Sequence, residues 1–183
     1  MGKLTFAINV TLDGCVDHRE GVADAELHEH FTRLMDGAEA MLFGRITYEM
    51  MESHWPAVAR NENAPADERH WAQKLDRKRK YVVSRSRQDF SWENTVHLVG
   101  DLREAIVALK AKTAGEVLVG SPTLDTQLEK LGLIDEYQLV VHPVIAGHGP
   151  TLLPGLKEPR QLELVATQRF AAGQIALHYR KKA

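Results

Sequence analysis

The sequence has little cysteine, little net charge and no long hydrophobic run. Its single cysteine, Cys15, has no partner for an internal disulfide, which excludes the disulfide-rich scaffolds of small secreted proteins. A formal net charge of −2 creates no field that would gather nucleic acid or an anionic membrane, so we expect neither as a partner. There is no apolar signal core and no segment of membrane-spanning length. We therefore expect a cytoplasmic protein whose partner is a small molecule.

The remaining composition is that of an ordinary globular protein. Of the 183 residues, 44% are hydrophobic and 26% are charged, which argues against disorder and against fibres. This length suits one domain over residues 1–183 with a substantial core, although length alone also leaves two small domains open.

Apolar runs of strand length alternate with helical patterns along the chain. We expect strands at residues 3–12, 40–43, 80–84, 96–99, 116–119 and 136–142. We expect helices at residues 24–35, 47–52 and 67–76, after an N-cap at Asp101, and between Ser121 and Gly132. The polar stretch at 55–68, with two prolines, reads as a loop.

Two alternating strands at 161–170 and 174–181 follow, joined by a glycine turn that indicates an antiparallel hairpin. Strands that alternate with helices imply a largely parallel sheet covered on both faces. We therefore predict an α/β fold in three layers, with a mixed, mostly parallel central sheet and a C-terminal antiparallel hairpin.

Three expected strands end in polar sequences: FGR at 43–45, SRS at 84–86 and VGS at 119–121. Ligands of parallel sheets bind outside the carboxyl ends of the strands. A glycine before a helix lets a phosphate approach free N–H groups and the positive end of the helix dipole, and a guanidinium can grip a phosphate with two hydrogen bonds. Each motif alone is better explained by a tight turn or a solvated side chain. Three on successive strands favour a dinucleotide.

Five motifs occur in an order shared with a known superfamily. They are TLDG at 11–14, LFGRITYE at 42–49, YVVSRS at 81–86, VGSPTL at 119–124 and GLIDEYQLVVHPVIAGHG at 132–149. With these motifs, nearly the whole chain resembles the dihydrofolate-reductase-like superfamily. It is most similar to the riboflavin-biosynthesis pyrimidine reductases, found as the C-terminal domain of the bifunctional deaminase-reductase and in stand-alone relatives. The deaminase half is not represented, because its zinc pattern needs more than one cysteine.

This resemblance implies a dihydrofolate-reductase-like fold, NADPH as cofactor and a set of binding residues. It places the cofactor phosphates at Gly44, Arg45 and Thr47, the adenosine 2′-phosphate at Ser84 and Arg85, the pyrophosphate at Gly120, Ser121 and Thr123, and the nicotinamide at Ala7, Asp13 and Gly14. No carboxylate follows the third strand before Asp89, which favours NADPH over NADH.

The proton donor is left open among three residues. Reduction of a heterocycle needs a donor within reach of the substrate, and folate reductases carry a carboxylate on the helix after the first strand. The corresponding stretch here, DAELHEHF, offers Asp24, Glu26 and His28. The HEH run does not predict a metal site, because side chains two positions apart on a helix point in different directions.

Two further residues are candidates for contact with the substrate. His142 ends an apolar strand where a substrate would lie, but a buried histidine bonded to backbone explains it slightly better. Trp55 either covers the substrate pocket or pins its loop to the core, and the sequence favours neither.

Three functions remain: an NADPH-dependent reductase of a pyrimidine- or pterin-like heterocycle, resembling 5-amino-6-(5-phosphoribosylamino)uracil reductase; a dihydrofolate reductase proper; and a nucleotide-binding protein without turnover. The resemblance favours the first. The C-terminal hairpin has apolar alternate positions and forms an exposed edge, so we also expect a homodimer.

Overall fold

The computed structural model describes residues 1–182. Its strands are β1 (Lys3–Thr11), β2 (Ala38–Gly44), β3 (Arg79–Val83), β4 (Thr95–Leu98), β5 (Glu116–Val119), β6 (Glu136–His142), β7 (Leu162–Arg169) and β8 (Ile175–Lys181). Its helices are α1 (Ala25–Gly37), α2 (Arg45–Arg60), α3 (Ala66–Arg77), α4 (Leu102–Lys112) and α5 (Pro122–Lys130). The predicted order of strands and helices is confirmed.

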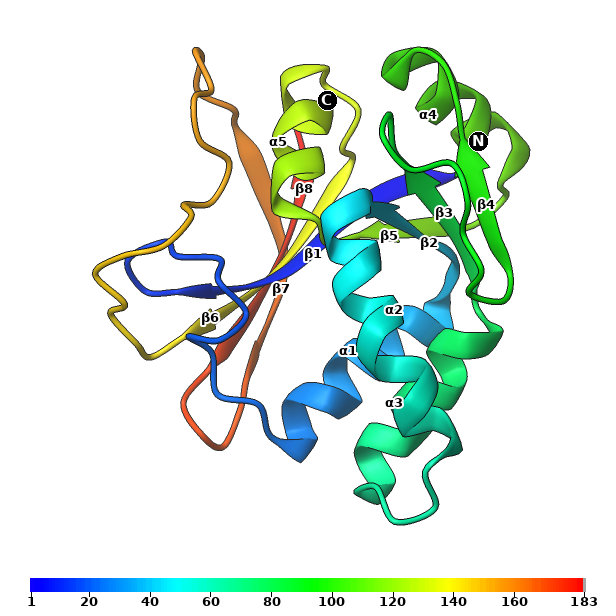
Figure 1. The fold of residues 1–183 in the computed structure, drawn as a ribbon. Helices are drawn as coiled ribbons and strands as arrows, with labels where there is room; N and C mark the ends of the chain where they lie inside the picture. Colours follow the sequence, from blue (N-terminus) through cyan, green and yellow to red (C-terminus); the bar gives the residue numbers. More distant parts are fainter. Residues whose placement is uncertain (183) are drawn as a thin grey trace.

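All eight strands form one sheet in the order β4-β3-β2-β5-β1-β6-β8-β7 (Figure 1). The first six strands pair in parallel, whereas β8 pairs antiparallel with both β6 and β7. This confirms the mostly parallel sheet and its C-terminal hairpin. β7 lies at one edge of the sheet and β4 at the other.

Helices cover both faces of the sheet, which makes three layers (Figure 1). On one face, alternate strand residues such as Leu42 and Val117 pack against Ile106 of α4 and Leu128 of α5. On the other face, the next strand position, Phe43, packs with residues of α1, α2 and α3. The two-residue period of a strand therefore sends its side chains into two separate cores.

The prediction of a loop from residue 55 was wrong, because α2 continues to Arg60. Pro56 lies inside this helix although proline removes a backbone hydrogen bond there. The continuation is held by packing: the Trp55 ring centre lies 4.3 Å from that of Trp71 on α3. The loop before α3 is correspondingly short.

The predicted helix ends are confirmed where a side chain or a glycine supplies the cap. Asp101 accepts a backbone N–H at the start of α4, as predicted, whereas Asp24, predicted as the first helical residue, instead caps α1. Gly132 has a positive φ of 70° just after α5. Within residues 1–182, no helix has both the length and the apolar composition needed to span a bilayer.

Candidate functional site

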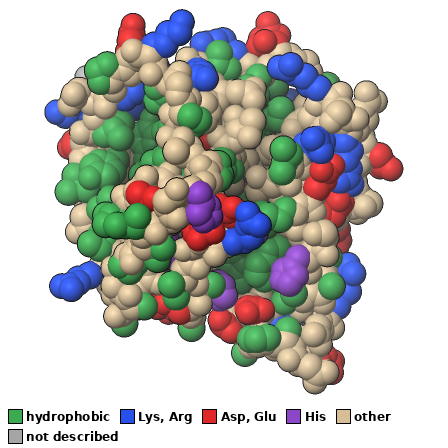
Figure 2. Space-filling view, turned by 60° about the vertical axis from the view of Figure 1, so that its left-hand side comes forward, with side chains coloured by type: hydrophobic (Ala, Val, Ile, Leu, Met, Phe, Trp, Pro, Cys, Tyr) green, Lys and Arg blue, Asp and Glu red, His purple; other side chains and the backbone are tan. Residues whose placement is uncertain are grey.

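The candidate site lies at the carboxyl ends of the neighbouring strands β1 and β5. After β1 the chain continues through β2 toward the β4 edge of the sheet, whereas after β5 it continues through β6 toward the β7 edge. Such a point in a parallel sheet leaves a crevice for a ligand. Figure 2 shows a hollow in this side of the molecule, with hydrophobic side chains on its floor and histidines and charged side chains around it.

Gly120, directly after β5, allows β5 and β1 to lie close together. A Cβ atom built on Gly120 would lie 2.5 Å from the carbonyl oxygen of Ala7 on β1, far inside van der Waals contact. The sequence therefore needs glycine here to pack β5 against β1, beside the crevice.

The starts of α2 and α5 are linked to each other. The Gly44 N–H donates to Oγ of Ser121 at 3.0 Å, although the two residues are 77 positions apart. The Ser121 N–H donates to Oδ2 of Asp125 at 2.6 Å, so this amide is not free to bind a phosphate. Neither helix has a side-chain N-cap, unlike α1 and α4. Thr47 and Thr123 lie in the uncapped first turns.

Asp125 lies fully buried beneath the start of α5. Burial raises the pKa of its carboxyl group well above the usual range, against the smaller opposing effect of the Ser121 N–H.

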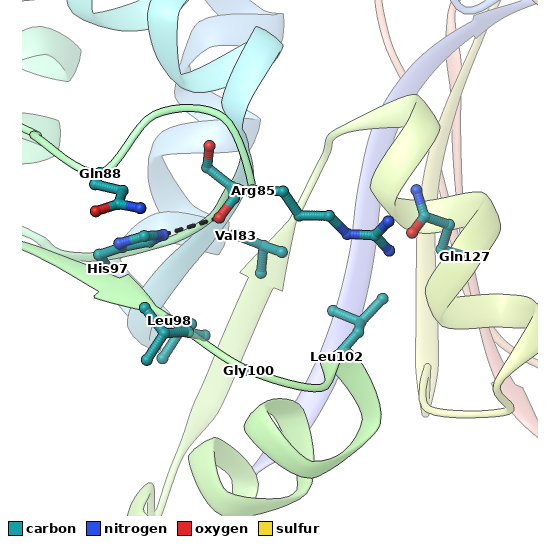
Figure 3. A pocket seen from close by; sticks show the side chains of 10 residues that line it. Val83, Arg85, Gln88, His97, Leu98, Gly100, Leu102 and Gln127 are labelled. Carbon is teal, nitrogen blue, oxygen red and sulfur yellow. Dashed lines mark hydrogen bonds between the residues drawn. The ribbon is translucent and has the colours of Figure 1, made fainter.

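A pocket of about 330 Å³ lies between the ends of β3 and β4 and the helix α5. Ser84 and Arg85 line it from one side and Gln127 from the other, with the apolar Leu98 and Leu102 below. Figure 3 shows the Arg85 side chain extended across the pocket toward Gln127. Among the described residues, Arg85 has no acidic partner within 4.0 Å. The pocket thus contains an unneutralised positive charge.

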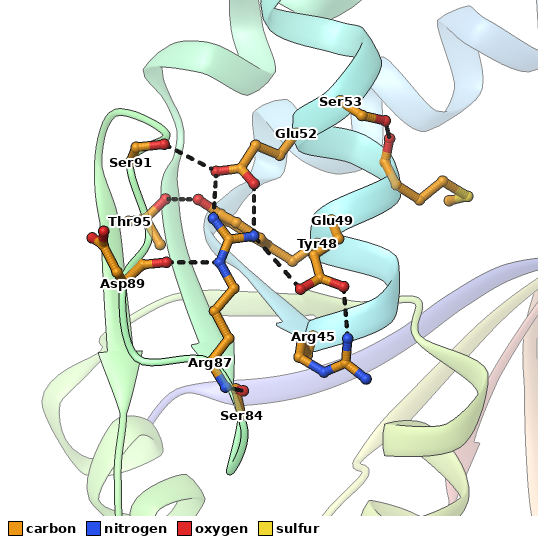
Figure 4. Close-up of polar contacts among 11 residues, drawn as sticks. Arg45, Tyr48, Glu49, Glu52, Ser53, Ser84, Arg87, Asp89, Ser91 and Thr95 are labelled. Atoms are coloured by element: carbon orange, nitrogen blue, oxygen red, sulfur yellow. Dashed lines mark hydrogen bonds and ion pairs between the residues drawn. The ribbon is translucent and has the colours of Figure 1, made fainter.

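The two neighbouring arginines are neutralised (Figure 4). Arg45 pairs with Glu49 at 2.7 Å within α2. Arg87 binds Glu52 through both terminal nitrogens, at 2.7 and 3.1 Å, and lies 3.7 Å from Glu49. Among the described residues that line this pocket, Arg85 is therefore the cation without an acidic partner.

The three candidate proton donors lie together at the start of α1 but have different partners. Asp24 accepts the Leu27 N–H at 2.8 Å, and this bond lowers its pKa, with further help from Gln174. Glu26 accepts the Ala171 N–H at 2.8 Å, from the turn between β7 and β8.

His28 instead pairs with an acid on another helix. Its Nδ1 lies 3.0 Å from Oδ2 of Asp67 in the first turn of α3. The bond from His28 lowers the pKa of Asp67. Within residues 1–182, Nε2 of His28 has no hydrogen-bond partner, so it is free for a further contact.

The two substrate candidates occupy different surroundings. His142 is 1% exposed, and its Nδ1 accepts the Val22 N–H at 3.1 Å while Nε2 lies 3.0 Å from Oδ1 of Asn9. Burial lowers the pKa of His142. Its ring thus holds the segment before α1 against the sheet. Trp55 packs between His54 and Trp71 on α2 and α3.

The turn at Asp13 and Gly14 joins two loops at the carboxyl edge. The Asp13 carboxylate accepts the Thr11 hydroxyl and the N–H groups of Ala146 and Gly147, which lowers its pKa to about 2. Gly14 has a positive φ of 89°, which the turn requires. Asp13 thereby ties the loop after β6 to the end of β1.

Sequence reasoning missed three residues of this region. Gln127 could have been found, because it lies one helical turn after Thr123 on the same face. Arg87 belongs to the SRSR run, but its ion pair with Glu52 depends on an approach of distant segments. Nothing in the sequence marks Asp67 as the partner of His28. Within residues 1–182, no group of three His, Cys, Asp or Glu side chains is arranged to hold a metal ion.

Comparison with known proteins identifies the family. The RibD C-terminal domain matches residues 2–176. The chain belongs to this family. An uncharacterized protein of Bacillus subtilis (strain 168), YyaP, is 26% identical over 181 residues, which are 97% of this chain and 94% of that protein. The match to the reductase-related RibD C-terminal domain confirms the resemblance inferred from the motifs.

Solved structures share the fold. A putative riboflavin biosynthesis protein from Shewanella sp. PV-4 has a TM-score of 0.73 at 21% identity, covering 100% of both chains. Dihydrofolate reductase from Enterococcus faecalis, complexed with NADP(H), has a TM-score of 0.66 at 14% identity, covering 99% of this chain and 97% of that one. The fold is therefore dihydrofolate-reductase-like, as predicted.

Proposed function

We propose that this RibD C-terminal domain protein is an NADPH-dependent reductase of a pyrimidine- or pterin-like heterocycle. One observation carries the proposal: two helices without side-chain caps start from the neighbouring strands β2 and β5, next to a pocket that contains the unpaired Arg85. Uncapped helix starts suit phosphates, and a free guanidinium suits a 2′-phosphate.

The pyrophosphate, the 2′-phosphate and the nicotinamide of NADPH can each be assigned to neighbouring residues along the sheet edge. Gly44, Thr47 and Thr123 lie at the uncapped starts of α2 and α5, where the remaining N–H groups suit a pyrophosphate. Ser84 and Arg85 lie in the adjoining pocket, where they would hold the 2′-phosphate. The nicotinamide would lie at the end of β1, near Ala7, Asp13 and Gly14. The NADP(H) complex of the Enterococcus faecalis enzyme supports a cofactor on this fold.

When bound, NADPH supplies the hydride for reduction of a C=N or C=O bond. The chain must then orient the heterocycle, exclude water and provide a proton. We propose His28 as the proton donor, because the carboxylates of Asp24 and Glu26 already accept backbone N–H groups. Asp67 fixes Nδ1 of His28 and leaves Nε2 free to hold the proton.

Turnover of candidate substrates tests the reductase proposal directly. NADPH oxidation is followed at its absorbance maximum with pyrimidine, pterin and dihydrofolate substrates. Oxidation that depends on a pyrimidine or pterin supports the proposal. Methotrexate-sensitive reduction of dihydrofolate alone would instead make the protein a dihydrofolate reductase. Cofactor binding without oxidation across the series would make it a non-catalytic nucleotide-binding protein.

The role of His28 predicts the effect of its replacement. If His28 donates the proton, His28→Gln should lower kcat by about 10²–10⁴-fold. Asp67→Asn should lower kcat less. A His28→Gln enzyme with the wild-type kcat would assign the proton to another group.

A further inference from the structure

Arg87 is held from several directions although it lies in a loop (Figure 4). Its guanidinium binds both carboxylate oxygens of Glu52 and donates from Nε to the carbonyl oxygen of Asp89 at 2.7 Å. The guanidinium carbon also lies 5.5 Å from the ring centre of Tyr48 and 4.9 Å from that of Phe90. These contacts fix the loop after β3 on α2.

The same residue reaches the proposed 2′-phosphate site through its backbone. The Arg87 N–H donates to Oγ of Ser84 at 2.9 Å. Since Oγ of Ser84 accepts this bond, its own hydrogen stays free to donate to a ligand. Ser84 and Arg85 are thus the first residues of a turn whose far end is pinned at Arg87.

We propose that Arg87 is a positioning residue for cofactor selection: clamped by Glu52, it holds Ser84 and Arg85 in the geometry that grips a 2′-phosphate. The inference rests on the proposed NADPH-dependent function. Arg87 does not bind the phosphate itself, because Glu52 and Glu49 already neutralise its charge. Burial raises the pKa of Glu52, but the hydrogen bond and charge of Arg87, together with the hydroxyl groups of Tyr48 and Ser91, lower it, and the net shift is downward.

A lysine at position 87 separates positioning from charge. Lysine keeps the positive charge but has no planar fork for Glu52. Arg87→Lys and Glu52→Gln should each weaken NADPH binding about tenfold, which corresponds to ~1.4 kcal/mol, and leave NADH binding within about twofold. Affinities are measured by cofactor fluorescence, and folding by thermal melting.

Arg180 provides a matched control. It binds Glu163 through two nitrogens, at 3.0 and 2.9 Å, on the hairpin far along the sheet from this loop. Arg180→Lys removes a similar two-point ion pair and should change neither cofactor affinity. Equal losses of NADPH and NADH affinity in Arg87→Lys would show a general structural role and overturn the inference.

A double variant distinguishes this inference from the proposed function. If Arg87 acts through Ser84 and Arg85, then Arg87→Lys should have a smaller effect on NADPH affinity once Arg85 is alanine. Additive losses would overturn the positioning role. If Arg85→Ala lowers NADPH affinity selectively but Arg87→Lys does not, only this inference fails. If Arg85→Ala leaves the NADPH to NADH ratio unchanged, the proposed cofactor selection itself fails.

Discussion

At the scale of single residues, buried partners fix the protonation state of His142. Nδ1 accepts the Val22 N–H and therefore carries no proton, so Nε2 carries the proton that is donated to Asn9. A Cβ atom on Gly21 would lie 3.2 Å from the ring, so this glycine lets the loop close over it. A second proton on the ring would face the Val22 N–H.

His142 should therefore make stability depend on pH. Burial lowers its folded pKa, while the unfolded ring titrates near about 6.5. Below about pH 6.5 the unfolded state takes up the proton first, so the free energy of unfolding falls as the pH decreases, by at most about 1.4 kcal/mol per pH unit.

Urea unfolding of wild type and His142→Gln at pH 5 to 8 checks this effect. The variant should be less stable at pH 8 and should lose less stability toward pH 5. His30, whose pKa is also lowered by burial, contributes equally to both curves, so their difference isolates His142. Parallel curves would contradict the assigned state of the ring.

At the scale of elements, the sequence predicted strands better than helix lengths. Short apolar runs such as residues 116–119 are marked by composition, and Asp101 and Gly132 mark helix ends chemically. The end of α2 carries no such mark: Pro56 suggested a break, and only the packing of Trp55 on Trp71 explains why the helix continues. That contact joins two different helices, and the hydrophobic periodicity of a single segment gives no information about such contacts.

Lys80 holds the end of α3 from the inside. Its fully buried ammonium group donates to the carbonyl oxygens of Leu75, Asp76 and Lys78 at 2.8, 2.9 and 3.0 Å. It also lies 4.6 Å from the ring centre of Trp92. Two of these carbonyl oxygens accept one further, longer hydrogen bond each: that of Leu75 from the Lys78 N–H at 3.2 Å and that of Asp76 from the Asn94 side chain at 3.3 Å.

Lys80→Met should therefore destabilise the protein by about 2–4 kcal/mol, because a methionine of similar size removes the charged donor from three carbonyl oxygens. The measurement is urea unfolding at neutral pH. Lys3→Met is the control, since the Lys3 ammonium is largely exposed and pairs only with Glu136 at the surface. Equal stability of the two variants would contradict the structural role of Lys80.

At the scale of the whole molecule, the sequence did not reveal the strand order. The three strand-end motifs favoured one dinucleotide but did not show which strands are neighbours; the sheet places β5 between β2 and β1 and so brings Gly44, Ser121 and Ala7 together. Parallel pairing depends on the packing of distant segments and leaves no local pattern. The resemblance to a family supplied the topology that the residues alone could not.

The hairpin edge predicts assembly. β7 is an edge strand, and its Leu164 and Val165 are 52% and 45% exposed. Exposed edges with apolar side chains pair readily with a second copy, so we propose a homodimer through this edge. Light scattering across a dilution series should give the dimer mass for wild type and the monomer mass for Leu164→Lys. A wild-type monomer at micromolar concentration would contradict the proposal.

The most direct test of the whole account is a fluorescence titration of wild type and Arg85→Ala with NADPH and NADH. Arg85 is the unpaired cation of the pocket, and a hydrogen bond to a charged group contributes about 1.5–3 kcal/mol. We predict that wild type prefers NADPH and that Arg85→Ala binds NADPH about ten- to a hundredfold more weakly, with NADH affinity nearly unchanged. Equal wild-type affinities for the two cofactors, or an unchanged ratio in the variant, would contradict the account.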